Sequence, residues 1–115
     1  MSSMNRGDVF EAVLDPTKGS EQGGTRPAII VSREIINENS PVVIIVPVSG
    51  KENHSRIYPS QVEIRSGDGG LRKDSVAMCE QVRAISKTRL TKGLGHLPNP
   101  VIVKINAALR IALDL

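Results

Sequence analysis

The residues best suited to chemistry in this chain are Arg26 and the glycine-rich segment that contains it, Gly19–Pro27. A residue before proline is restricted to extended backbone geometry, so Pro27 narrows the conformations of Arg26. Gly23 and Gly24 carry no side chain that would hold another molecule at a distance. A guanidinium presents paired planar donors and stays charged, which suits a phosphate. The segment therefore predicts a phosphate-binding arginine; the alternative is a tight turn with a surface arginine.

Two further polar residues stand where a site could open. Ser49 follows the apolar run Val42–Val48, so its hydroxyl is expected at the mouth of a strand; the alternative is a hydroxyl that satisfies a turn. Glu80 falls, by alternation, on the apolar face of Val76–Ile85. Either a bulge turns this side chain outward or its carboxylate borders a pocket.

The histidines and the single cysteine are weaker candidates for catalysis or metal binding. His54 lies in the polar loop Ser49–Tyr58 and is a minor candidate for a general base, with a plain solvated histidine as the alternative. His96 is interpreted as structural and Cys79 as a core residue. No His, Cys and carboxylate cluster has ligand spacing, so we expect neither a metal nor a cofactor.

The elements that must position these residues are mostly strands. Continuous apolar runs indicate central strands at Pro27–Ser32 and Val42–Val48. Glycine and proline make the loop Asp15–Thr25 rich in turns, and Ser66–Gly70 is a strong hairpin or loop signal. Arg33–Ser40 is expected to hold one helical turn. Four more strands are expected, at Val9–Leu14, Gln61–Arg65, Val76–Ile85 and Leu94–Leu97, with a short helical turn at Lys87–Leu90 capped by Ser86.

The clearest helix begins at Asn99-Pro100, with Asn99 as its N-cap and proline in its first turn. Helical spacing predicts that its buried face carries Ile102, Ile105, Leu109 and Ala112. Short strands around a small core, closed by one terminal helix, are typical of a mainly β fold. We expect a small half-open barrel of the SH3-like kind with a C-terminal helix.

Composition limits the classes of function. The 115 residues are expected to form one domain, 1–115, with residues 1–5 as a flexible tail. The chain has no apolar run long enough for a membrane span, no signal-peptide character near its start and a single cysteine, so we expect a cytoplasmic protein. The net charge of +3 mildly favours polyanions, and ordinary solubility is the alternative. Phe10 and Tyr58 are the only aromatic residues, which argues against a base-stacking platform.

Three blocks of sequence carry a resemblance to a known family. They are Asp15–Pro27, Val46–Ser49, and Asp74–Val76 followed by Glu80–Ile85; the first is specific because it matches many positions without a gap. Over nearly its whole length the chain resembles the MazF/PemK family of bacterial toxins, ribosome-independent mRNA endonucleases of toxin–antitoxin pairs. The resemblance implies an SH3-like fold, a homodimer and a single-stranded mRNA substrate. It also implies a cognate antitoxin whose acidic disordered tail folds in the RNA groove.

The resemblance further implies metal-independent cleavage, in which the RNA 2′-OH attacks the neighbouring phosphorus and leaves a 2′,3′-cyclic phosphate and a 5′-OH. It gives Arg26 two alternative roles, as electrostatic stabiliser and as proton donor to the leaving oxygen; we favour charge stabilisation because a guanidinium is a poor acid. Ser49 stands where the family usually carries threonine. Some members pair an aspartate at the position of Glu80 with an arginine two residues earlier, but this chain has Met78 there. Glu80 and Gln81 are therefore interpreted as contacts to a base edge. The full set of implied RNA-binding residues is Arg6, Lys18, Glu21, Gln22, Gly24, Thr25, Lys51, Glu80 and Gln81.

A non-catalytic binding module on the same barrel is the main alternative function. It includes the gyrase-poisoning relatives of this fold, which depend on a Trp-Gly-Ile C-terminus, whereas this chain ends Ala112-Leu113-Asp114-Leu115. The third option is a toxin relative that has lost activity, for which Ser49 in place of threonine is the only hint.

Overall fold

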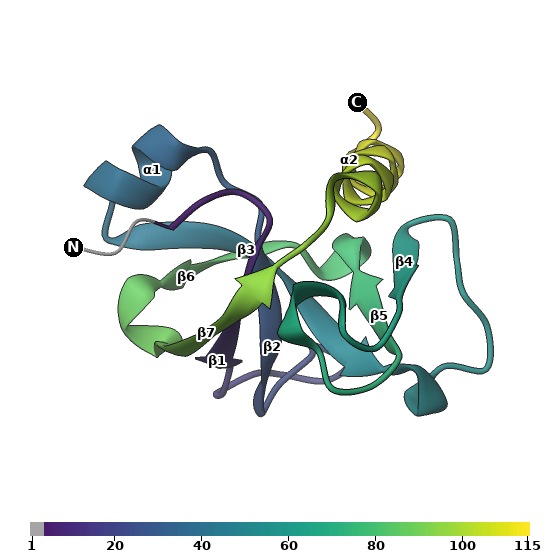
Figure 1. Cartoon of the computed structure of the whole chain (residues 1–115). Coiled ribbons are helices and arrows are strands. Elements are labelled where there is room, and N and C mark those ends of the chain that lie inside the picture. The colour runs from purple at the N-terminus through teal and green to yellow at the C-terminus, as the bar shows by residue number, and fades with distance from the viewer. Residues whose placement is uncertain (1–3) are drawn as a thin grey trace.

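Seven antiparallel strands form the framework of the structure, a computed structural model that describes residues 4–115 (Figure 1). Residues 1–3 of the expected tail therefore lie outside the described residues. The predicted mainly β fold with a C-terminal helix is confirmed. The strands are β1 (Asp8–Val13), β2 (Thr25–Ile30), β3 (Val42–Gly50), β4 (Gln61–Ile64), β5 (Ser75–Met78), β6 (Arg83–Ser86) and β7 (Leu90–His96).

Two α-helices and four short 3₁₀ turns complete the described part of the chain. The helices are α1 (Glu34–Asn39) and α2 (Asn99–Leu113). The 3₁₀ turns are η1 (Lys51–Asn53), η2 (Asp68–Gly70), η3 (Cys79–Gln81) and η4 (Lys87–Arg89). No helix among residues 4–115 has the length and apolar character needed to cross a membrane.

β3 is the central strand of the sheet, because it pairs with β2, β5 and β6. The strand order is β4-β5-β3-β2-β1-β7, with β6 on β3 as well. One edge of β3 pairs with β2, through Ala28 opposite Pro47 and Ile30 opposite Ile45. Its other edge pairs first with β6 and then with β5. Because both edges of β3 are occupied and its side chains are almost all buried, the strand is apolar nearly throughout, as its sequence predicts.

Alternation of side chains across the strands produces two apolar clusters. Val9 and Ile29 point to the first cluster, which α2 covers with Ile105 and Ala108. Ala12 and Ile30 belong to the second cluster on the other side. Figure 1 shows α2 lying across the sheet after β7, where it closes the first cluster.

The predicted strand Val76–Ile85 is wrong, because the chain leaves the sheet between Met78 and Arg83. The register explains the break. Val48 of β3 faces Ala77 and Ile45 faces Arg83, so two residues of β3 stand opposite the five residues 78–82. The three surplus residues cannot pair and form the 3₁₀ turn η3. This turn, rather than the expected bulge, carries Glu80 outward to an exposed position.

Other boundaries also differ from expectation. β2, at Thr25–Ile30, begins and ends two residues before the predicted strand Pro27–Ser32. β7 begins at Leu90, four residues before the predicted start at Leu94. It follows the predicted helical turn, in which Thr88 N donates to Ser86 Oγ at 3.3 Å. Asn99 is not the N-cap of α2: the cap is Pro98, without a side-chain hydrogen bond. Pro100 then lies in the first turn, where backbone N–H groups have no acceptor within the helix. The N–H that proline lacks is therefore not needed there.

The buried face of α2 is centred on Ile105 and Ala108. Ile102 and Leu109 pack against the same cluster while partly exposed, and Ala112 is half-buried. Ala108 was not among the predicted residues of this face.

Candidate active site

The loop between β1 and β2 delivers Arg26 to the start of β2. Leu14 N donates to Gly24 O at 2.9 Å, which closes the loop at its base. Gly24 has φ +78°, a backbone conformation that glycine adopts without strain. A Cβ on Gly23 would lie 2.5 Å from Asp15 Oδ1 and 2.6 Å from Thr17 Oγ1. Gly23 thus makes room for side chains of this loop rather than for a ligand.

The guanidinium of Arg26 is held by several acceptors. Its Nε donates to Gly23 O at 2.5 Å, and Nη1 lies 3.4 Å from Val48 O. The Gln22 amide, oriented so that its oxygen faces these donors, accepts from Nη1 at 2.8 Å and from Nη2 at 2.9 Å. Gln22 is fixed in turn, because its backbone N donates to Gln81 Oε1 at 2.6 Å. The turn η3 therefore supports Arg26 through one intermediate residue.

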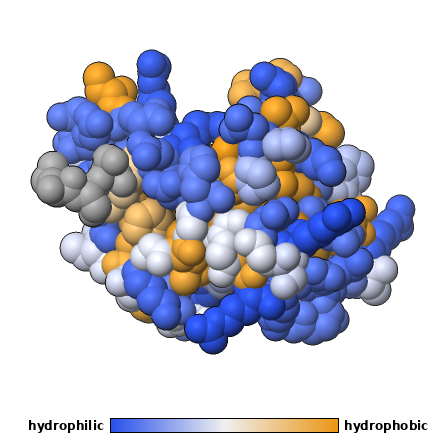
Figure 2. All heavy atoms as spheres, viewed as in Figure 1, coloured by the Kyte–Doolittle hydropathy of each residue, from blue (hydrophilic) through white to orange (hydrophobic). Residues whose placement is uncertain are grey.

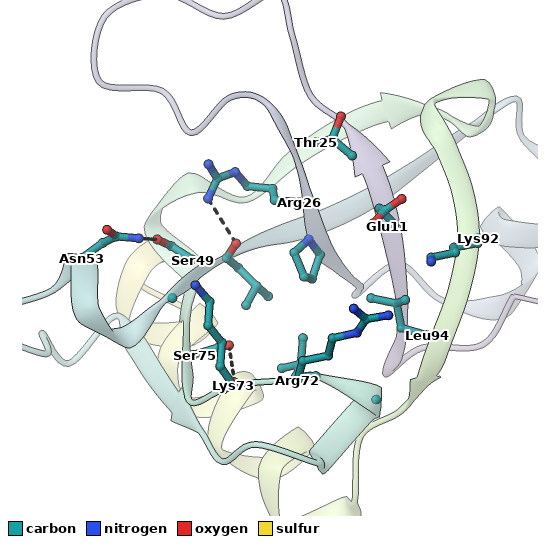
Figure 3. A pocket seen from close by; sticks show the side chains of 15 residues that line it. Glu11, Thr25, Arg26, Ser49, Asn53, Arg72, Lys73, Ser75, Lys92 and Leu94 are labelled. Carbon is teal, nitrogen blue, oxygen red and sulfur yellow. Dashed lines mark hydrogen bonds between the residues drawn. The ribbon is translucent and has the colours of Figure 1, made fainter.

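Arg26 opens onto a cleft of about 450 Å³ (Figure 3). The cleft contains two of the predicted site residues besides Arg26, namely Thr25 and Ser49. Four side chains around it are cationic and one is a carboxylate, a balance that favours an anionic ligand. The lining residues are Glu11, Thr25, Arg26, Pro27, Val48, Ser49, Gly50, Asn53, Gly70, Leu71, Arg72, Lys73, Ser75, Lys92 and Leu94.

Ser49 lies near the end of β3 and is 4% exposed. Its backbone pairs with Val76 of β5, so the strand fixes its position. Its Oγ accepts a hydrogen bond from Asn53 Nδ2 at 3.1 Å (Figure 3). Because the amide of Asn53 fills an acceptor site of this oxygen, the hydroxyl proton remains available to a ligand in the cleft.

Sequence reasoning missed the other charged residues of the cleft. Arg72 and Lys73 come from the segment between β4 and β5, and Lys92 comes from β7. Lys73 Nζ also contacts Glu52 Oε2 at 2.5 Å. Only Glu11 had a local signal, because alternation along β1 places it on the same side as the buried Val9. Lys92 reaches the cleft through the pairing of β7 with β1, and Arg72 and Lys73 reach it from the loop before β5, placements that the sequence does not display.

Three predicted RNA-binding residues gather at a second hollow of about 390 Å³, lined by Ser20, Glu21, Glu80, Gln81, Val82 and Arg83. Glu80 accepts a hydrogen bond from Gln61 Nε2 at 2.8 Å. Gln81 uses its oxygen on Gln22 N, and its Nε2 lies 3.5 Å from Ser20 O. Gln81 thus connects this hollow to the support of Arg26.

Three other predicted RNA-binding residues lie apart from both hollows. Arg6 Nε donates to Val31 O at 2.8 Å, and Arg6 borders a third hollow beside α2. Lys18 is exposed on the β1–β2 loop. Lys51 Nζ contacts Glu63 Oε2 at 2.8 Å, and this hydrogen bond with Glu63 raises the pKa of Lys51.

The histidines and the cysteine stand outside the cleft. His54 Nε2 is buried without a hydrogen-bond partner in the described part of the chain. His96 Nδ1 lies 2.8 Å from Asp8 Oδ1, which fits its structural interpretation. Burial, with a smaller contribution from the charge of Glu80, raises the pKa of the Cys79 thiol to about 12. Within residues 4–115, no three His, Cys, Asp or Glu side chains gather in a group that could hold a metal ion.

Known proteins resemble this chain along nearly its full length. A family described as PemK-like, MazF-like toxin of type II toxin–antitoxin system matches residues 5–113. The protein named Endoribonuclease MazF from Staphylococcus saprophyticus is 42% identical over 112 residues, which are 97% of this chain and 92% of that protein.

Solved structures share the fold. An endoribonuclease in complex with its cognate antitoxin, from a mycobacterial species, has a TM-score of 0.81 at 26% identity and covers 98% of this chain and 97% of that one. MazF from Deinococcus radiodurans has a TM-score of 0.84 at 22% identity, with both chains covered completely. The chain therefore belongs to the PemK-like, MazF-like toxin family of type II toxin–antitoxin systems.

Proposed function

We propose that this toxin is an endoribonuclease whose active site is the Arg26 cleft, and that it cuts single-stranded mRNA at a short defined sequence. The observation that carries the proposal is the placement of Arg26 and Ser49 in one cationic cleft. The 42% identical relative named Endoribonuclease MazF supports the reaction class. The site supplies what phosphoryl chemistry needs, namely fixed donors where negative charge develops.

The reaction is an attack of the RNA 2′-oxygen on the adjacent phosphorus. The new bond joins O2′ to phosphorus, the bond from phosphorus to O5′ breaks, and the products are a 2′,3′-cyclic phosphate and a 5′-OH. The 2′-OH gives up one proton and the departing O5′ takes up one. The Arg26 guanidinium stabilises the charge on the non-bridging oxygens, and the Ser49 hydroxyl donates to one of them. These fixed donors supply the charge stabilisation, so we propose that the reaction needs no metal.

Sequence recognition is assigned to the second hollow. Glu21, Glu80 and Gln81 border it and carry carboxylate and amide groups that pair with the exposed edges of bases. Bases are accessible in this way only in unpaired RNA, which is the reason for a single-stranded substrate.

We also propose a cytoplasmic homodimer inhibited by an antitoxin with an acidic disordered tail. Four large apolar side chains of α2 and the C-terminus are exposed, at Val103, Ile111, Leu113 and Leu115. Figure 2 shows apolar residues on α2 beside a hollow in the surface between this helix and α1. A second copy would cover this surface. The cations of the Arg26 cleft suit an acidic tail, which would then compete with RNA.

The test is cleavage of RNA by the purified protein in EDTA, with the new ends mapped chemically. We expect 2′,3′-cyclic phosphate and 5′-OH ends, and no cut where the nucleotide before the scissile phosphate lacks its 2′-OH. Arg26→Ala should lower the single-turnover rate about a hundredfold, since removing one fixed charge stabiliser costs about 3 kcal/mol. Arg33→Ala, an exposed arginine outside the cleft, is the control. A folded Arg26→Ala variant with the original rate would move the active site elsewhere.

A further inference from the structure

The Arg26 cleft has a second half whose chemistry differs from that of the first. In Figure 3, Arg26, Ser49 and Asn53 lie on one side of the cleft, and Glu11 and Lys92 lie on the other. The first side presents donors to a phosphate. The second side presents a carboxylate, an acceptor of hydrogen bonds, beside the ammonium group of Lys92.

Strand register places this second half on a rigid support. Glu11 of β1 stands directly opposite Pro27 of β2 and directly opposite Lys92 of β7. Direct partners on neighbouring strands share a face of the sheet, so Pro27, Glu11 and Lys92 form a row across three strands. All three line the cleft, and Leu94 lies beside them.

Glu11 is held in place without a charged partner. Its Oε1 lies 3.2 Å from Thr91 Oγ1, which lies at the same distance from the backbone oxygen of Glu11. Within residues 4–115, no cationic side chain lies within 4.0 Å of this carboxylate. It is the single carboxylate among the residues that line the cleft. A fixed carboxylate with an unused oxygen is an acceptor for N–H groups.

We propose that this half of the cleft binds one nucleobase next to the scissile phosphate, and that Glu11 selects bases with an exocyclic amino group over uracil. The inference rests on the proposed function and names the substrate feature that the same cleft reads. Adenine, cytosine and guanine present amino N–H donors, which a carboxylate accepts. Uracil presents two carbonyl oxygens beside its single N–H, and these repel the carboxylate.

The remaining groups of this half fit the same ligand. Pro27 and Leu94 offer apolar surface to the face of a base, in a cleft to which neither Phe10 nor Tyr58 contributes. Lys92 offers a positive charge to a phosphate of the same nucleotide. Glu11 therefore determines specificity, and charge stabilisation at the reacting phosphorus stays with Arg26.

The experiment measures kcat/KM on RNA oligonucleotides that differ by one base at each position around the mapped cleavage site. For the wild type we expect uridine, at one position adjacent to the scissile phosphate, to lower kcat/KM about tenfold or more relative to the best base. Glu11→Gln keeps the size of the side chain but can donate to a uracil carbonyl. It should abolish this preference at that position and leave the preferences at other positions unchanged. Glu11→Ala should abolish it as well.

Glu38→Gln, on the exposed part of α1, removes the same charge away from the cleft and should keep the wild-type profile. Unchanged base preferences in both Glu11 variants, with cleavage intact, would overturn this inference and leave the proposed function standing. An equal loss on every substrate would also overturn it, because Glu11 would then act on the chemical step. A wild type that cuts no RNA would overturn the proposed function itself.

Discussion

The support of Arg26 by Gln22 leads to a prediction that separates positioning from RNA binding. Gln22 accepts two hydrogen bonds from the guanidinium, at 2.8 and 2.9 Å. Gln22→Met keeps the length of the side chain and removes this acceptor. Gly23 O, at 2.5 Å, remains as a partner, so Arg26 keeps part of its orientation.

The magnitude follows from the acceptors that are lost. A hydrogen bond to a charged group contributes about 1.5–3 kcal/mol to stability. The Arg26 side chain is half-buried and regains water when Gln22 withdraws, so the lower end applies. If the free energy that favours the reactive orientation of Arg26 falls by about 1.5 kcal/mol, the single-turnover cleavage rate falls about tenfold.

The assay is single-turnover cleavage at saturating protein, with RNA affinity measured separately on a substrate blocked by a 2′-deoxy nucleotide. We expect the rate to fall and the affinity to stay within about twofold. In the Arg26→Ala background, Gln22→Met should add no further loss, because the group that it positions is gone. Asn39→Leu, which removes an exposed side-chain amide on α1, away from both hollows, is the control. Weaker RNA binding at an unchanged rate, or additive losses in the double variant, would refute the positioning role.

Three further outcomes are expected. Ser49→Ala should lower the single-turnover rate about threefold to tenfold, whereas Ser49→Thr should keep or raise it because a β-branched side chain is stiffer at χ1; full activity of the alanine variant would contradict this role. Gly70→Ala should lower the free energy of unfolding in urea by more than about 2 kcal/mol, because φ is +75° and the new Cβ would lie 2.0 Å from the Leu94 carbonyl oxygen. Gly67→Ala, with φ +97° and open space around it, is the control and should cost clearly less. Burial raises the pKa of Cys79 from 9.0 to about 12, so above about pH 9 the unfolded chain loses a proton that the folded chain keeps. Stability should therefore fall with rising pH there, by up to about 1.4 kcal/mol per unit, and Cys79→Ala should remove that component in urea unfolding measured from pH 8 to 11.

Local sequence was sufficient to predict the strands β2 and β3 beside Arg26, although β2 begins at Thr25, two residues before the predicted start at Pro27. The run of glycines before Pro27 and the apolar stretch after it are contiguous, so their consequences are local. The charged residues that line the cleft with Arg26 could not be predicted in this way. Lys92 reaches the cleft through the pairing of β7 with β1, and Arg72 reaches it from the loop before β5; no periodicity within one segment reports either placement.

The break at η3 was missed for a related reason. Residues 76–85 alternate well enough for one strand, and only the count of partners on β3 shows that they cannot all pair. The capping residue of α2 was misplaced by one position because Asn99 and Pro98 both suit a helix start, and backbone geometry decided between them.

The three residues of η3, which have no partners on β3, form a segment whose sequence can vary without altering the sheet. Residues in η3 contribute nothing to the strand ladder, so substitution or insertion there does not shift the pairing of β5 or β6. Glu80 projects from this turn to the surface, while Gln81 is tied to Gln22. Divergence among relatives can therefore alter one side of the turn at little energetic cost, whereas Gln81 is constrained by the neighbouring loop. Under the proposed function, new recognition sequences are therefore accessible to this fold without rebuilding its sheet.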